Sequence, residues 1–167
     1  EESVPFNMEA DSLNCSVLGE DAVPGTPEFD LFIKEVQREM TVKAGQKCTA
    51  IRRVLVPEKL VEDVQIALGQ RLAKTVIGDP SQEGVRMGAL AGKEQLEEVT
   101  TQVNKLAQTQ EIVYGSLTDF EVMGADKNKG AFLSPILFLN NDPFNKTDCH
   151  NIEAFGPVST ILPYKTI

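Results

Sequence analysis

Apolar residues recur along the chain at two spacings, one typical of helices and one typical of strands. Helical spacing is clearest in a segment with charged residues on the opposite face, which comprises Phe29, Phe32, Ile33, Val36 and Met40. Thr26 is suited to cap this helix, and Pro27 to occupy its first position. We therefore predict a helix from Pro27 to about Val42, with Gly45 as its stop.

Short apolar runs bounded by turn residues predict strands between the helices. They are Leu13 to Leu18, Ile51 to Pro57, Glu111 to Gly115, Ile136 to Asn140 and Val158 to Leu162. Two further helices are predicted, from Glu58 to about Lys74 and from about Lys93 to Gln108. Residues 116–134 are turn-rich and are expected to form a surface excursion. Helices that alternate with strands predict an α/β fold with a largely parallel sheet.

The net charge of the chain mainly serves to exclude certain classes of partner. The 167 residues carry 16 Lys and Arg against 25 Asp and Glu, so the formal net charge is −9. Such a surface repels phosphate, which argues against a nucleic acid or an anionic membrane as a partner. No apolar run approaches the roughly 20 residues that span a bilayer, and no signal peptide is present, so we expect a single cytoplasmic domain.

The cysteines and the histidine limit the kinds of site. Cys15, Cys48 and Cys149 are widely spaced and form no CxxC pair, so neither a disulfide framework nor a zinc site is expected. His150 is the single histidine, which excludes any site that needs two. We therefore predict no metal site.

Cys48 is the candidate nucleophile because it lies between a predicted helix and a predicted strand. Loops at strand ends carry many of the active groups of α/β folds. Small residues around Cys48 would expose backbone N–H groups that could hold an oxyanion. Lys47, Arg52 and Arg53 are close in sequence and would favour the thiolate. A lone cysteine is more often a buried, inert side chain, so these residues alone leave both interpretations open.

Two other groups could take part in thiol chemistry. Glu9 precedes the first predicted strand, where a carboxylate could act as a general base, although a lone acid is usually solvated. Cys149 and His150 could form a thiol–imidazole pair, but adjacent side chains usually point in different directions. A thiol hydrolase or acyltransferase built on Cys48 would need His150 as its partner. A non-catalytic module of the same fold is a third alternative.

Several motifs, taken together, resemble those of the aldehyde dehydrogenase family. Residues 45–53 (GQKCTAIRR) are similar to the active-site cysteine signature of the family, and residues 8–12 (MEADS) occupy the place of its glutamate motif. Residues 153–158 (EAFGPV) resemble the motif near the cofactor. Residues 78–80, Gly88 and residues 131–135 also resemble family segments, and the order and separations match from one end of the chain to the other.

The resemblance implies the family's three-layer catalytic domain and its chemistry. Cys48 would attack an aldehyde to give a thiohemiacetal, hydride transfer to a nicotinamide would leave a thioester, and Glu9 would activate the water that hydrolyses it. Glu153 would bind the nicotinamide ribose, and Phe155 would pack near the ring. Residues 10–12 replace the leucine and two glycines usual after the glutamate, which puts in doubt how the nicotinamide is held there.

Two stretches, EADSLN and AGQKCTAIRR, resemble one bacterial branch of the family: the dehydrogenase half of the bifunctional ring-opening proteins of phenylacetic acid degradation. Members oxidise a coenzyme A-linked semialdehyde, usually with NADP, so NADP is favoured over NAD. Residues 1–167 are then expected to be a catalytic-domain fragment that lacks most of the cofactor-binding domain and the oligomerisation strand. The full protein would be a homo-oligomer, and the isolated chain would turn over little substrate.

Overall fold

A five-stranded sheet forms the centre of the computed structural model, which describes residues 5, 7 and 12–166 of the chain. Its strands are β1 (Asn14–Val17), β2 (Ile51–Pro57), β3 (Glu111–Tyr114), β4 (Ile136–Leu139) and β5 (Val158–Tyr164). The order across the sheet is β1-β2-β5-β4-β3. β1, β2, β5 and β4 are parallel, and β3 pairs antiparallel with β4 at one edge. The predicted α/β fold with a largely parallel sheet is therefore confirmed.

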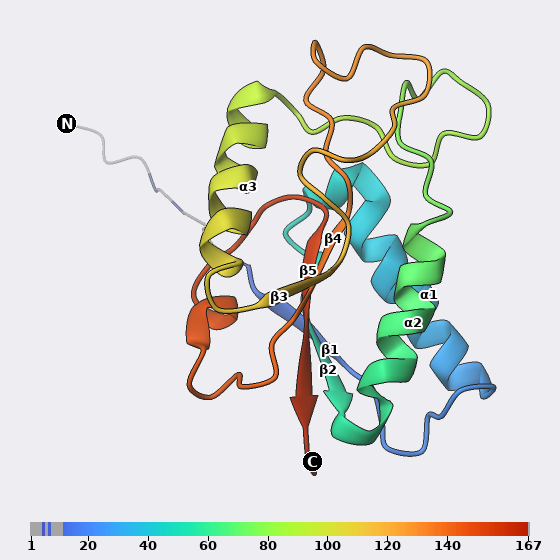
Figure 1. Cartoon of the computed structure of the whole chain (residues 1–167), viewed down its shortest axis with the longest axis vertical. Coiled ribbons are helices and arrows are strands. Elements are labelled where there is room, and N and C mark those ends of the chain that lie inside the picture. The colour runs from blue at the N-terminus through green and yellow to red at the C-terminus, as the bar shows by residue number, and fades with distance from the viewer. Residues whose placement is uncertain (1–4, 6, 8–11, 167) are drawn as a thin grey trace.

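Helices cover both faces of this sheet. They are α1 (Pro27–Thr41), α2 (Val61–Leu72) and α3 (Lys93–Leu106), with short 3₁₀ turns at Val42–Gly45, Glu58–Leu60 and Thr147–His150. Figure 1 shows α1 and α2 on one side of the sheet and α3 on the other, which gives the three layers that the family resemblance implies. None of the helices in the described part of the chain combines the length and apolarity that a bilayer crossing requires.

Burial on both faces explains why the strands read as continuous apolar runs. In β4, Leu137 packs into the core beneath α1 and α2. Its neighbours Ile136 and Phe138 pack into the second core, beneath α3. Successive side chains of a strand point to opposite faces, so each residue of β4 serves one of the two cores. The sheet is thereby held rigidly between helices, and its strand ends can position loops accurately.

One helix agrees with its predicted bounds and another differs. α1 ends at Thr41, within one residue of the predicted end at about Val42. Lys43 and Ala44 adopt left-handed backbone conformations, with φ of 54° and 51°, which no α-helix accommodates. The segment predicted as one helix from Glu58 begins with a 3₁₀ turn, and α2 proper starts at Val61. Residues 116–134 are turn-rich, as predicted, but the predicted surface excursion does not include residues 131–134, which are buried.

Candidate active site

Three of the sequence motifs meet at one end of the sheet because of the strand order. β1, β2 and β5 are neighbouring parallel strands, so the segments that precede them emerge side by side. Ser12 precedes β1, the Cys48 turn precedes β2, and residues 153–157 precede β5. Residues that are far apart in the sequence are thereby brought together. Glu9, the predicted general base, lies outside the described residues.

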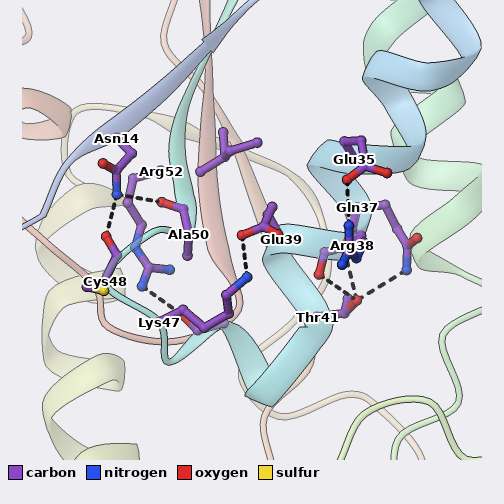
Figure 2. A network of polar contacts seen from close by, with 12 residues as sticks. Asn14, Glu35, Gln37, Arg38, Glu39, Thr41, Lys47, Cys48, Ala50 and Arg52 are labelled. Carbon is purple, nitrogen blue, oxygen red and sulfur yellow. Dashed lines mark hydrogen bonds and ion pairs between the residues drawn. The ribbon is translucent and has the colours of Figure 1, made fainter.

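Cys48 lies on the turn that leads into β2, and its side chain is exposed. Asn14, the first residue of β1, holds this turn from the neighbouring strand. Its Nδ2 atom donates hydrogen bonds to the carbonyl oxygens of Cys48, at 2.5 Å, and Ala50, at 3.3 Å (Figure 2). The turn is therefore fixed through its backbone, while the thiol remains accessible to a reactant.

Arg52 is a buried cation that joins the Cys48 turn to residues 153–157. Its Nη2 atom donates to the carbonyl of Gly45 at 2.7 Å, and Nη1 donates to that of Gly156 at 2.5 Å. Its Nε atom lies 3.8 Å from Oε1 of Glu153. Burial lowers the pKa of Arg52 from its usual value to about 10, although the neighbouring Glu153 carboxylate opposes this shift. Arg52 therefore stays charged at neutral pH.

Glu153 and Phe155, the residues predicted to contact a nicotinamide cofactor, surround this cation. The backbone N–H of Ser12 donates to Oε2 of Glu153 at 3.0 Å, and its hydroxyl donates to Oε1 at 2.9 Å. The ring centroid of Phe155 lies 5.5 Å from the Cζ atom of Arg52, and 38% of Phe155 is exposed. The arrangement therefore presents a carboxylate and an aromatic face in the same region as the Cys48 turn.

Gly45 is the point of closest approach between the two loops. Its φ of +69° falls in the left-handed region that favours glycine. A Cβ atom at this position would overlap the carbonyl of Gly156 and lie 2.9 Å from the carbonyl of Met40. Gln46, the next residue, accepts a hydrogen bond from the Ala91 backbone N–H at 2.8 Å. The close approach of the two loops thus explains the glycine of the cysteine motif, and the hydrogen bond from Ala91 explains its glutamine.

The cations expected to favour the thiolate are each engaged elsewhere. Lys47 forms an ion pair with Glu39, with 2.6 Å between Nζ and Oε2. Arg53 donates to the carbonyl of Leu13, and its Nη1 lies 3.4 Å from Nδ1 of His150. Arg52 is turned toward the carbonyls described above. The contacts of these three side chains therefore stabilise the surrounding loops.

Cys149 and His150 point to different partners. The Cys149 sulfur accepts a hydrogen bond from Asn140 Nδ2 at 3.4 Å, and burial raises the pKa of this thiol. Nε2 of His150 lies 3.1 Å from the carbonyl oxygen of Pro143. This geometry gives no support to a thiol–imidazole pair. The described part of the chain also holds no cluster of three or more His, Cys, Asp or Glu side chains suited to a metal ion.

Sequence reasoning missed the structural roles of Asn14 and Arg52. For Arg52 a signal was present, because the side chains of β2 alternate between the two faces of the sheet. Arg52 lies in phase with Val54 and Val56, and all three are buried. The pattern therefore predicts an inward-facing cation. For Asn14, whose partners belong to another strand, the sequence holds no comparable signal.

Solved aldehyde dehydrogenases share this fold. Aldehyde dehydrogenase C of Pseudomonas syringae, solved with NAD⁺ and octanal, superposes with a TM-score of 0.73 at 22% identity, over 93% of this chain and 30% of that protein. Betaine aldehyde dehydrogenase of Staphylococcus aureus, solved with NAD⁺, gives a TM-score of 0.74 at 24% identity, over 87% of this chain and 27% of that one. At these identities the likeness concerns the fold.

Residues 5–167 match the family model of the aldehyde dehydrogenase family, and the chain belongs to this family. A 3,4-dehydroadipyl-CoA semialdehyde dehydrogenase from Aromatoleum evansii is 47% identical to it over 162 residues. The aligned region covers 97% of this chain and 32% of that relative. The chain thus spans about a third of the length of this curated relative.

Proposed function

We propose that the chain supplies the nucleophile, and part of the cofactor contacts, of an NAD(P)-dependent aldehyde dehydrogenase. Membership in the family supports this proposal. The observation that carries it is the Arg52 junction, which ties the exposed Cys48 turn to Glu153 and Phe155. A thiol that forms a covalent adduct and a group that contacts a cofactor must lie close together, and this junction brings their segments together.

In the proposed reaction, the Cys48 thiolate attacks the aldehyde carbon, and a thiohemiacetal forms with its oxygen held by the Cys48 backbone N–H. Glu153 and Phe155 would hold a nicotinamide dinucleotide, which would supply the acceptor for the hydride that this adduct loses as it becomes a thioester. Glu9 takes a proton from the water that attacks the thioester, which releases a carboxylic acid and restores the thiol. The bond between Asn14 and the Cys48 carbonyl keeps the turn in one conformation during these steps.

The residues around Glu153 fit a nicotinamide ribose. An ionised carboxylate has about four acceptor positions, and Ser12 occupies two of them. The remaining positions would accept hydroxyl groups of a ribose, and the exposed face of Phe155 would lie against the nicotinamide. Arg52 would hold both side chains in place from beneath.

The proposed substrate is an aldehyde linked to coenzyme A, in a pathway of aromatic degradation such as that of phenylacetate. The 47% identity to a protein named as a CoA-semialdehyde dehydrogenase supports this substrate class. NADP is the proposed cofactor because of the branch resemblance, although the two solved relatives were obtained with NAD⁺. We further propose a cytoplasmic homo-oligomer in which this chain joins a cofactor-binding domain.

A pair of cysteine variants tests this function in a full-length protein that contains the chain. Cys48→Ser should lower NAD(P)-dependent aldehyde oxidation by a factor of at least about 10³, because its hydroxyl is a far weaker nucleophile. Cys15→Ser is the matched control, since Cys15 is also exposed, and should leave turnover within about twofold. Activity that survives in Cys48→Ser would overturn the proposal. Loss of Cys48 alkylation in His150→Ala would instead support a thiol hydrolase.

A further inference from the structure

A groove of about 650 Å³ between α1 and α2 is unusually basic for this chain. Four cations line it, namely Arg38 on α1, Arg71 on α2, and Lys74 and Arg86 beyond it. Its lining includes one carboxylate, that of Asp30. The whole chain has 16 cationic and 25 acidic side chains. A quarter of the cations therefore line this groove, together with a single acidic side chain. We call this feature the basic groove.

Most of the positive charge in the basic groove is not neutralised by neighbouring residues. Arg38 forms an exposed ion pair with Glu35, at 3.0 Å. Within the described ranges, no carboxylate oxygen lies within 4.0 Å of Arg71, Lys74 or Arg86. Like charges that gather in a concave surface raise the local concentration of anions. The basic groove is therefore suited to an anionic ligand, although the chain as a whole is acidic.

The lining and the volume of the basic groove indicate what kind of anionic ligand it fits. Phe29 and Ile33 line its floor but are almost fully buried in the core, so they offer a ligand little apolar area. Gln37 donates hydrogen bonds to the hydroxyls of Thr41 and Thr75, both at 3.3 Å, and so ties α1 to the segment after α2. The volume falls within the roughly 300–1,000 Å³ typical of small-molecule sites. A concave site of this volume with a cationic rim fits a nucleotide that bears several phosphates.

The basic groove and the proposed nucleophile are separated by the ion pair between Glu39 and Lys47. Arg38 is adjacent to Glu39, whose carboxylate binds Lys47, the residue before Cys48. Figure 2 shows this ion pair between Cys48 and the C-terminal turn of α1. A ligand in the groove would therefore need a long, flexible arm that passes Lys47 in order to reach the thiol.

We propose that the basic groove binds the phosphates of the nucleotide carrier to which the aldehyde substrate is attached, a coenzyme A-type thioester. This inference rests on the proposed function of Cys48. The phosphates of NADP are the other source of the same chemistry. The lining of the groove includes neither Glu153 nor Phe155, the proposed cofactor contacts, and this favours the substrate carrier. The groove lies on the side of the sheet that α1 and α2 cover (Figure 1).

Calorimetric titration of the chain with S-methyl coenzyme A tests the proposal, since a thioether cannot exchange with Cys48. We expect one binding site, with affinity that falls as salt is raised. The double variant Arg71→Glu/Lys74→Glu should weaken binding at least tenfold. Its matched control is Lys59→Glu/Lys105→Glu, which changes the net charge equally at exposed positions outside the groove and should stay within twofold.

Three outcomes would overturn the proposal: no binding of S-methyl coenzyme A, equal weakening in both double variants, or displacement by NADP at lower concentrations than coenzyme A itself requires. Weaker binding after removal of the 3′-phosphate would support it. Because the titration needs no turnover, it is independent of the proposed reaction. Binding that persists in Cys48→Ser, combined with full activity of that variant, would remove the proposed function and leave the groove as a coenzyme A site.

Discussion

The guanidinium of Arg52 and the carboxylate of Glu153 face each other in the interior, with 3.8 Å between Nε and Oε1. The two side chains are only 4% and 9% exposed. Arg52 also donates to the carbonyls of Gly45 and Gly156, so one cation joins the cysteine motif to the proposed cofactor motif. The two motifs are therefore in contact through Arg52, in addition to occurring in the family's order along the chain.

Replacing Arg52 with methionine should lower the free energy of unfolding by about 3–5 kcal/mol, because Glu153 would be left as a buried carboxylate without its partner. Urea denaturation would measure this loss. Arg38→Met is a suitable control, since Arg38 is exposed and its ion pair with Glu35 is worth at most about 1 kcal/mol. Similar losses in both variants would show that the buried position of Arg52 does not account for its effect on the free energy of unfolding.

Gly45→Ala should destabilise the chain by at least about 2 kcal/mol, because a left-handed conformation costs an L-residue roughly 1–2 kcal/mol and the added methyl meets the Gly156 carbonyl. Gly25→Ala measures the cost of the left-handed conformation alone. Gly25 has a φ of +91°, and a Cβ there would have no neighbour within 4 Å. Thermal unfolding of both variants would give the difference, and equal shifts would argue against a clash at Gly45.

Asn14→Ala should lower the free energy of unfolding by about 1 kcal/mol, since it removes the hydrogen bonds to the carbonyls of Cys48 and Ala50 at a partly solvated position. The freed turn should also change the alkylation rate of Cys48 and leave that of Cys15 unaltered. Mass spectrometry of both thiols during iodoacetamide treatment would measure this. Asn104→Ala, on the exposed face of α3, should change neither quantity.

Cys149 should contribute to the loss of stability at alkaline pH. Burial raises the pKa of its thiol above the usual 9.0, so the folded state holds this proton more tightly than the unfolded state. Its stabilisation is complete below pH 9 and is lost as the pH rises from there through the folded-state pKa, with a slope of at most about 1.4 kcal/mol per pH unit.

Urea denaturation between pH 8 and pH 11 measures this contribution. Cys149→Ala should show a shallower decline than the parent chain, in spite of its lower stability at pH 7. Cys15→Ala, which alters an exposed thiol, should retain the parent slope. If the slopes of Cys149→Ala and the parent chain coincide, the protonation of Cys149 is not coupled to folding.

The strands and helices were largely predictable because a sheet buried on both faces produces continuous apolar runs. The antiparallel direction of β3 was not, since side-chain periodicity is the same for both directions. For Arg52, alternation along β2 indicates burial, but its partner Gly156 lies 104 residues away. Proximity to Cys48 in sequence suggested an effect on the thiolate, whereas the guanidinium in fact binds two carbonyls.

Ser12 and Glu153 are separated by 141 residues and yet share two hydrogen bonds. Their proximity depends on the order of β1, β2 and β5 within the sheet. Residues 124–129, at the tip of the excursion over residues 116–134, are mostly exposed, and doubling the length of such a loop costs only about 0.6 kcal/mol in closure entropy. The protein can therefore gain or lose residues at this tip during evolution without altering the spacing of the groups at the site.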